Sequence, residues 1–359
     1  MLILGIESSC DDTSVALVEA KKDRFIVLSE KTASQVDIHK KYGGVVPEIA
    51  GRQHAEKILP LIEAVIKHLN IQTSKHLNID VIAVTAGPGL ITGLLVGVEA
   101  AKTLSYLWNV PLVRVNHISG HAHSVEIRSA RWRTKSEIRN KIEFPALCLI
   151  VSGGHTELLL MKTHTEFELI GKTRDDAAGE TFDKVGKLLG FAYPGGAKIS
   201  KTAEGGNTKA IKFPRPMIRE GYEFSFAGLK TAALYWLRDN TKQKTIGYEL
   251  LAMNLSDFCA SFEQAIVDVL VTKTIRAAKQ YKPKSIILAG GVSANQKLRE
   301  QLKNKLNTIG GSLLAPNLKY AMDNAAMIAV AGYYQALKKD FTLWDKIEAD
   351  PNWKVYPVK

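Results

Sequence analysis

The chain has 359 residues and is 46% hydrophobic, which is enough apolar material to bury a large core in more than one lobe. No stretch approaches the roughly 20 consecutive apolar residues that span a bilayer, so we expect no membrane anchor. Its three cysteines, Cys10, Cys148 and Cys259, are odd in number and widely spaced. They exclude a disulfide framework and predict reduced thiols in a cytoplasmic protein.

The formal net charge is +12, from 48 Lys and Arg against 36 Asp and Glu. Such an excess favours a polyanionic partner, because each neutralised phosphate releases counterions. The densest basic stretch runs from Arg128 to Lys141 and contains Trp132. It is either a solvated linker between lobes or a flexible arm that contacts an RNA backbone.

The chain opens with a predicted β-hairpin. Residues Leu2–Ile6 form an apolar strand, Glu7–Thr13 a polar turn, and Ser14–Val18 the returning strand. Further along, a buried strand at 80–85, a helix around 94–107 and a strand at 111–115 predict a βαβ unit with parallel pairing.

A second hairpin is predicted within Ala146–Leu160, turning at Ser152-Gly-Gly-His-Thr156. The pair Gly153 and Gly154 would free the backbone to take positive φ and expose its amides as an anion site. An ordinary hairpin turn is the alternative. We expect this second hairpin to repeat the architecture of the first.

The rest of the chain is predicted to be mainly helical. One helix begins near Ala177 and ends at Gly190, and a long one covers Leu250–Gln280. An apolar strand then meets Gly290-Gly291 before another helix, and the last strong helix begins near Met322-Asp323. This order is typical of two-lobed nucleotide binders of the actin and sugar-kinase type. We expect lobes at 1–127, joined by a returning 325–345, and at 146–324, with 128–145 as the basic arm.

His117 and His121 lie four residues apart, so a helical turn would place both imidazoles on one face, as a metal requires. A metalloprotease would need Glu after the first histidine, but Ile118 stands there. The best candidate for a third ligand is Asp323. The alternatives are a coincidental His pair, and an aspartate that only caps the last helix.

Several motifs occur together and in a fixed order, and together they are far more specific than any one alone. They are Gly5-Ile-Glu-Ser-Ser-Cys-Asp-Asp-Thr13, Gly43-Gly-Val-Val-Pro47, Gly87-Pro-Gly89, His117-x3-His121, Val151-Ser-Gly-Gly-His-Thr156, Asp175-Asp-Ala-Ala-Gly-Glu180, Tyr193-Pro-Gly-Gly196, Phe224-Ser-Phe-Ala-Gly-Leu-Lys230 and Gly290-Gly-Val-Ser-Ala-Asn295. With these motifs the chain resembles the tRNA N6-adenosine threonylcarbamoyltransferase family, the bacterial TsaD proteins and their mitochondrial relatives.

The resemblance implies an α/β actin-like ATPase (ASKHA) fold with two duplicated lobes and a nucleotide cleft between them. It implies transfer of a threonylcarbamoyl group from threonylcarbamoyl-adenylate to N6 of the adenosine 3′ of the anticodon in ANN-decoding tRNAs, with release of AMP. By position, His117, His121 and Asp323 would hold one metal per subunit, most often Fe²⁺. The donor would be bound by Ile150, Val151, Ser152, Gly153, Gly154, Asp183, Gly196 and Asn295.

The general base is left open among Asp11, Asp12 and Glu180. Ser119 and Ser200 stand where some relatives carry acids, and the basic arm is longer than is typical of the family. The resemblance also implies partners, either a paralogous TsaB-like subunit with a small TsaE-like ATPase, or a second copy in a homodimer. Two other functions remain possible: an ATPase or small-molecule kinase on the same fold, and a non-catalytic scaffold for nucleic acid.

Overall fold

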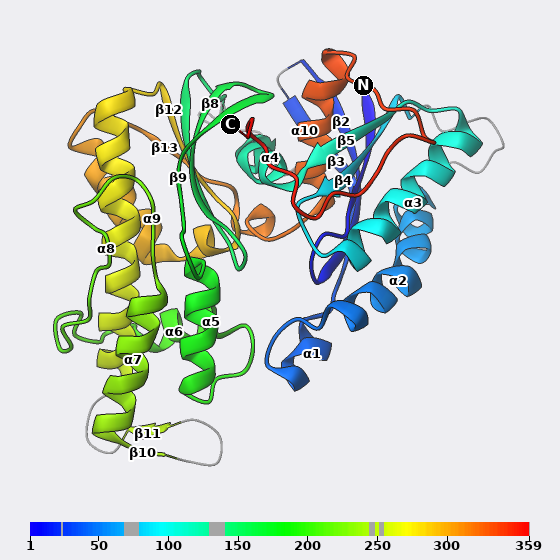
Figure 1. The fold of residues 1–359 in the computed structure, drawn as a ribbon. Coiled ribbons are helices and arrows are strands. Elements are labelled where there is room, and N and C mark those ends of the chain that lie inside the picture. Colours follow the sequence, from blue (N-terminus) through cyan, green and yellow to red (C-terminus); the bar gives the residue numbers. More distant parts are fainter. Residues whose placement is uncertain (23, 68–78, 129–140, 244–247, 251–254, 359) are drawn as a thin grey trace.

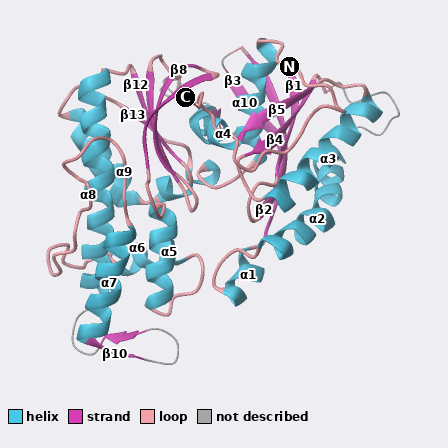
Figure 2. Cartoon of the chain, viewed as in Figure 1, coloured by secondary structure: helices cyan, strands magenta, loops and turns pink. Residues whose placement is uncertain are grey.

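A computed structural model describes residues 1–22, 24–67, 79–128, 141–243, 248–250 and 255–358 of the chain. Two twisted β-sheets stand side by side, each with helices packed on it (Figures 1 and 2). Within these residues, no helix is both long and apolar enough to cross a membrane. Most of the predicted basic arm lies at 129–140, outside the described residues.

The first sheet has the strand order β5-β4-β1-β2-β3-β6. β1 pairs with β2 antiparallel and with β4 parallel, and β4 pairs with β5 parallel. The predicted first hairpin and βαβ unit are therefore both present. The strands are β1 (Leu2–Glu7), β2 (Asp12–Lys21), β3 (Arg24–Ser34), β4 (Val81–Gly87), β5 (Leu112–Asn116) and β6 (Ile127–Arg128).

Helices cover both faces of the first sheet. α2 (Pro47–Lys67) and α3 (Ile91–Trp108) bury their apolar stripes on one face, and α10 (Ala325–Leu337) packs on the other. The short α1 (Val36–His39) precedes them. α10 comes from near the end of the chain, so this sheet is completed by a segment more than 300 residues from its first strand.

The second sheet, ordered β13-β12-β7-β8-β9, repeats the plan of the first. Its first strand again pairs antiparallel with the next strand and parallel with a later one. This repetition confirms the duplicated lobes. The third strand of each lobe, β3 and β9, was not predicted from the sequence. The strands are β7 (Ala146–Val151), β8 (Thr156–Thr163), β9 (Glu166–Lys172), β12 (Ser285–Ala289) and β13 (Leu313–Leu314).

A helical layer packs on the second sheet and forms the largest core of the protein. Gly190 follows the first of these helices with φ of 75°, as expected of a terminating glycine. The long predicted helix begins at Leu255. The elements are α5 (Ala178–Leu188), α6 (Gly195–Thr202), α7 (Ala227–Asn240), α8 (Leu255–Tyr281) and α9 (Gln296–Asn307), with a small ribbon of β10 (Thr241–Gln243) and β11 (Tyr248–Leu250).

One short helix, α4 (His117–His123), lies between the two sheets (Figure 1). It begins directly after β5, where the side chain of Asn116 accepts a hydrogen bond from the amide of Ile118 and caps the helix. Ile118 and Ala122 are buried in one cluster with Ile150 and Leu159 of the second sheet. The helix predicted to carry the two histidines is thus held by both lobes.

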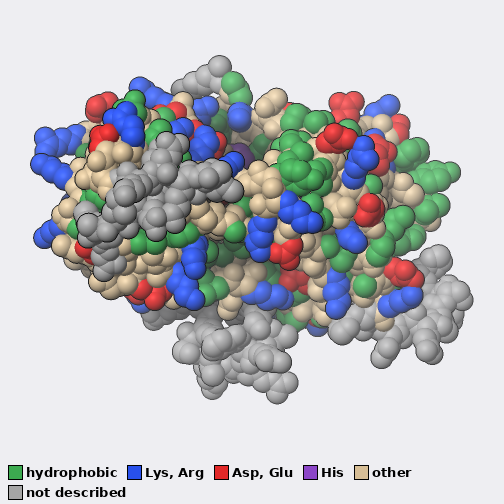
Figure 3. All heavy atoms as spheres, turned by 90° about the horizontal axis from the view of Figure 1, so that it is seen from below, with side chains coloured by type: hydrophobic (Ala, Val, Ile, Leu, Met, Phe, Trp, Pro, Cys, Tyr) green, Lys and Arg blue, Asp and Glu red, His purple; other side chains and the backbone are tan. Residues whose placement is uncertain are grey.

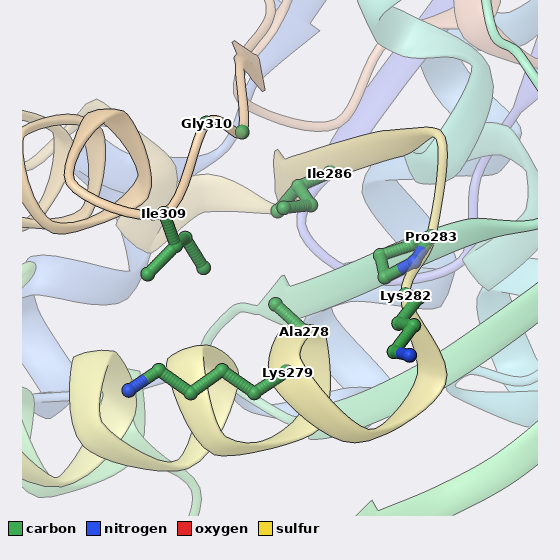
Figure 4. Close-up of a pocket in the computed structure, with 8 residues that line it drawn as sticks. Ala278, Lys279, Lys282, Pro283, Ile286, Ile309 and Gly310 are labelled. Atoms are coloured by element: carbon green, nitrogen blue, oxygen red, sulfur yellow. The ribbon is translucent and has the colours of Figure 1, made fainter.

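Basic side chains are scattered rather than gathered in one patch on the face that Figure 3 shows. On the face seen from below, Lys and Arg side chains occur over both halves with acidic ones between them (Figure 3). A pocket of about 340 Å³ lies between the end of α8 and the turn after α9, lined by Lys279, Lys282, Pro283, Ile309 and Gly310 among others (Figure 4). None of the predicted site residues lines it.

The packing of α10 on the first sheet gives a test of the fold. A Cβ on Gly332 would lie 2.4 Å from Cβ of Ala83, whereas one on Gly228 in α7 would approach nothing closer than 3.8 Å. Alanine normally favours a helix over glycine by about 1 kcal/mol. We expect Gly332→Ala to lower the free energy of unfolding by about 1–3 kcal/mol through overpacking, as measured by denaturant titration. The matched Gly228→Ala should be neutral or stabilising, and equal stability of the two variants would contradict this packing.

Candidate metal centre and substrate cleft

The site forms where three neighbouring parallel strands end. β1, β4 and β5 are adjacent in the first sheet and run in the same direction, so their carboxyl ends meet at one edge. Glu7 ends β1, Thr85 lies near the end of β4, and His117 begins the helix that follows β5. Ligands of open α/β sheets bind at this kind of edge.

The structure brings the three predicted metal ligands together. Oδ1 of Asp323 lies 3.2 Å from Nε2 of His121 and 3.5 Å from Nε2 of His117. Both imidazoles project from α4, with ring centroids 4.6 Å apart, as the four-residue spacing predicts. The alternative role for Asp323 as a helix cap is wrong, because α10 begins at Ala325 and its cap is the side chain of Asn324.

Glu7 is a buried carboxylate of this site that the sequence analysis did not single out. Its Oε2 lies 2.9 Å from Nδ1 of His117 and accepts a hydrogen bond from the hydroxyl of Thr85 at 2.8 Å. Its Oε1 accepts from the amide of Ser9 at 2.6 Å. A carboxylate behind a histidine is the usual outer partner of a metal-binding imidazole. The sequence signal for Glu7 was its position at the end of a strand that belongs to a group of parallel strands.

Opposite charges hold this buried cluster together. Burial alone would lower the pKa of His117, but the carboxylates of Glu7 and Asp323 raise it to about 9. Burial alone would raise the pKa of Asp323, but His117 and His121 hold it well below its usual range. For His121, burial and the neighbouring His117 lower the pKa, which leaves its imidazole neutral. Each charge would be costly here without its partner.

The cluster suits a divalent metal. Nδ1 of the fully buried His121 has no hydrogen-bond partner among the described residues, and its Nε2 faces Oδ1 of Asp323 at 3.2 Å without the geometry of a hydrogen bond. Metal–nitrogen bonds of about 2.1 Å place adjacent ligands about 3.0–3.4 Å apart, close to the 3.2 and 3.5 Å separations between Asp323 and the two imidazoles. Two imidazoles and one carboxylate leave positions open for a substrate. The residues present therefore fit the metal that the resemblance implies.

The three candidate bases have different surroundings. Glu180 is 43% exposed, forms an ion pair with Lys184 and accepts a weak hydrogen bond at the start of α5, so its role there is structural. Asp11 accepts a hydrogen bond from the hydroxyl of Tyr193 across the two lobes. Burial, followed by the charge of Asp323, raises its pKa.

Asp12 combines burial with a carboxylate oxygen that is shielded from solvent and unpaired among the described residues. Burial raises its pKa to about 7, and the charge of Asp323 adds to this effect. Its Oδ1 has no hydrogen-bond partner in the described part of the chain. A carboxyl that titrates near neutral pH is suited to accept a proton during catalysis.

The second hairpin turn lies within electrostatic range of the metal cluster, because the charges of His117, His121 and Asp323 act on His155. The turn differs from its prediction in backbone conformation. Neither Gly153 nor Gly154 has positive φ, so the expected left-handed turn is wrong. Both are exposed, a Cβ on either would meet nothing within 4 Å, and their amides donate to no group in the described residues. Ile150 and Val151 are buried in β7, so only their backbone could touch a ligand, and Ser152 pairs with His155 to close the turn.

Residues beyond the hairpin are already engaged within their lobe. Oδ1 of Asp183 accepts hydrogen bonds from the amides of Gly195 and Gly196 and so fixes the start of α6. Asn295 caps α9 through the amide of Leu298, and its Nδ2 donates to Ser200 at 2.9 Å. Thus Ser200, which stands where some relatives carry an acid, contacts a predicted donor-binding residue.

Solved structures with this architecture fix the fold class. The chain superposes on HypF from T. kodakarensis with a TM-score of 0.61 at 14% identity, covering 94% of this chain and 48% of that one. It also superposes on component A of (R)-2-hydroxyglutaryl-CoA dehydratase from Acidaminococcus fermentans, with a TM-score of 0.51 at 12% identity, covering 94% and 99%. At these identities the likeness shows the fold alone, the two-lobed actin-like ATPase fold expected from the sequence.

Sequence comparison assigns the family. Residues 26–330 match the family described as TsaD: tRNA N6-adenosine threonylcarbamoyltransferase. The tRNA N6-adenosine threonylcarbamoyltransferase of Listeria monocytogenes serotype 4b is 50% identical over 334 residues, which cover 92% of this chain and 90% of that protein. That of Bacillus subtilis strain 168 is 49% identical over the same coverage. The chain belongs to the tRNA N6-adenosine threonylcarbamoyltransferase family. It is therefore a transferase that modifies tRNA, and the ATPase or kinase alternative is disfavoured.

The contact between Glu7 and His117 yields a prediction for metal affinity. We expect Glu7→Gln to weaken binding of a divalent metal by about 10–100-fold, because the imidazole loses the carboxylate that orients it. Equilibrium dialysis of chelator-treated protein against Fe²⁺ or Co²⁺ without oxygen measures this. Glu157→Gln, another buried carboxylate in β8, is the matched control and should bind as the wild type does. Unchanged affinity in Glu7→Gln would show that the contact does not support a metal.

Proposed function

We propose that this chain transfers the threonylcarbamoyl group of threonylcarbamoyl-adenylate to N6 of the adenosine 3′ of the anticodon in ANN-decoding tRNAs, releasing AMP. The observation that carries the proposal is the convergence of His117, His121 and Asp323 beside the turns of both hairpins. Family membership supports the reaction class, and the contacts within the His117, His121 and Asp323 cluster support the position of its parts.

In this proposal the metal ligands are His117, His121 and Asp323, and the metal is Fe²⁺, one per chain. A bound divalent cation would supply positive charge beside the donor phosphate. Glu7 orients His117 from behind through the 2.9 Å contact between its Oε2 and Nδ1 of the imidazole. The free amides of Gly153 and Gly154 add hydrogen bonds for the phosphate, which makes AMP a better leaving group.

The donor would lie along the second lobe, against the backbone of Ile150 to Gly154, with Asp183, Gly196 and Asn295 further along the cleft. Asp183 accepts hydrogen bonds from the amides of Gly195 and Gly196, and so it fixes the end of the proposed donor-binding surface that α6 forms. The exocyclic amine of adenine is a weak nucleophile, so its orientation against the carbamoyl carbon supplies much of the acceleration.

Of the three candidate bases we favour Asp12. As N6 bonds to the carbamoyl carbon and AMP departs, the amine must lose a proton, and the Asp12 carboxylate would accept it. The unpaired Oδ1 of Asp12 and its pKa of about 7 support this role. Asp11 remains the alternative within the same hairpin turn.

The proposed reaction also implies a cellular setting. We propose that it acts in the cytoplasm, as expected from the reduced thiols that its three cysteines predict. The partners proposed from the family resemblance are a paralogous TsaB-like subunit with a TsaE-like ATPase, or a second copy of this chain. The net charge of +12 suits tRNA as the polyanionic substrate.

Reconstitution tests the function. We expect purified protein, supplied with a threonylcarbamoyl-adenylate synthase, threonine, bicarbonate, ATP and unmodified ANN-decoding tRNA, to form threonylcarbamoyladenosine detectable by nucleoside mass spectrometry. The reaction is run with and without a TsaB-like and a TsaE-like protein. His121→Ala and Asp323→Ala should lose bound metal by elemental analysis and lose product together. ATP turnover without donor or tRNA, and no modified nucleoside with any partner set, would favour the ATPase alternative.

The role of Asp12 is tested by the pH profile. A base must be deprotonated, so kcat/KM of the wild type should fall as pH is lowered through an apparent pKa at or below about 7. Asp12→Asn should lower kcat by about 10²–10⁴-fold and abolish this limb of the profile. Glu180→Gln is the matched control, because that carboxylate pairs with Lys184. The proposal fails if Asp12→Asn keeps both the rate and the acid limb.

A further inference from the structure

A second group of metal-ligand side chains lies at the other end of α4. Ligand atoms of His123, Glu126 and His164 all lie within 4.8 Å of one another. His123 ends α4, Glu126 ends the short helical turn 124–126 that follows, and His164 lies between β8 and β9 of the second sheet. Both His123 and Glu126 are buried, and His164 is half-buried.

The ring of His123 is oriented as a metal ligand would be. Its Nδ1 lies 2.7 Å from the carbonyl oxygen of Ser119, which can only accept, so Nδ1 carries the proton. In the neutral ring, Nε2 then presents its lone pair, and it points to Nδ1 of His164 at 3.4 Å. A histidine whose second nitrogen donates to a backbone carbonyl is the common arrangement in metal sites.

The spacing fits a small tetrahedral ion. With Zn–N bonds of about 2.1 Å, two imidazole nitrogens on one zinc lie about 3.4 Å apart. This equals the 3.4 Å between His123 and His164. The carboxylate of Glu126, within 4.8 Å, needs to close by at most about 1.4 Å to complete a two-His, one-carboxylate set of the kind zinc accepts.

The outer surroundings also hold these ligands in place. The hydroxyl of Tyr334 on α10 donates to Oε1 of Glu126 at 2.9 Å. The ring of the same tyrosine stacks on His164, with centroids 3.5 Å apart and planes 7° from parallel. One side chain therefore orients two of the three ligands, which is the kind of support that metal ligands usually have.

Helix geometry separates this group from the first cluster. Residues two apart on an α-helix point about 200° away from one another, so His123 faces away from His121. The Cα atoms at the two ends of α4 are about 9 Å apart at 1.5 Å per residue. The two groups can therefore be filled independently.

We propose that His123, Glu126 and His164 form a second metal site, for Zn²⁺, that ties the two lobes of the protein together. Two ligands come from the segment that joins β5 and β6 of the first sheet and one from a turn of the second sheet, so a bound ion links elements of both. The alternative is a histidine–histidine hydrogen bond that binds no metal. Because this zinc would bind the folded protein and not the unfolded chain, it would also raise the thermal stability of the protein.

The number of metal ions bound per full chain distinguishes a zinc site from a histidine–histidine hydrogen bond that binds no metal. After chelation, the wild type dialysed against Zn²⁺ should hold two equivalents by elemental analysis. His164→Asn should hold one, Asp323→Ala one, and the double variant none. Zn²⁺ should raise the melting temperature of Asp323→Ala but not of the double variant. Co²⁺ bound to Asp323→Ala should give the strong visible absorption of a tetrahedral site.

Two further variants control for a loss of zinc that is caused only by misfolding. Glu166→Gln, on the same turn as His164, is the matched control and should retain both equivalents. Tyr334→Phe keeps the stacked ring but removes the hydroxyl, and should weaken the second equivalent by about 10–100-fold. The proposal is overturned if His164→Asn and Tyr334→Phe bind zinc as the wild type does, or if Asp323→Ala alone removes all of it.

Discussion

The structure depends on a buried charge balance at the meeting point of the two lobes. Glu7, His117 and Asp323 are each too costly to bury alone as ions, and each is stabilised by its neighbour. Because Glu7 ends β1, His117 begins α4 and Asp323 precedes α10, this balance fixes three elements from distant parts of the chain relative to one another. A cation fits the same place because the ligands already face one another.

The α4 helix, which carries His117 and His121, also links the two lobes. It is capped by Asn116 at the edge of the first sheet and buries Ile118 and Ala122 against the second. A helix of seven residues would be unstable alone, so packing from both sides must maintain it. The contacts of the metal cluster and the relative position of the lobes therefore depend on the same short segment. The proposed zinc site would add a further link at its far end.

Much of the fold could be predicted because its determinants are local. Alternating and continuous apolar runs identify β1, β4, β7 and β12, and the four-residue spacing of His117 and His121 places both rings on one helical face. The sequence predictions failed where the local sequence pattern is weak. Strand β3 and the edge strand β9 are only partly buried, and the backbone of Gly153 and Gly154 did not need the positive φ that glycine allows.

The sequence by itself determined the family and the duplicated order of elements, because these follow from residue types and from spacing along the chain, and through the family resemblance it predicted His117, His121 and Asp323 as metal ligands. Only the tertiary structure decided that Glu7 stands behind His117, that Asn324 rather than Asp323 caps α10, and that His164 meets His123. Those contacts join residues between 41 and 110 positions apart, or depend on where a helix begins to within one residue. They follow from how the two sheets and α10 pack, and no local pattern carries that information.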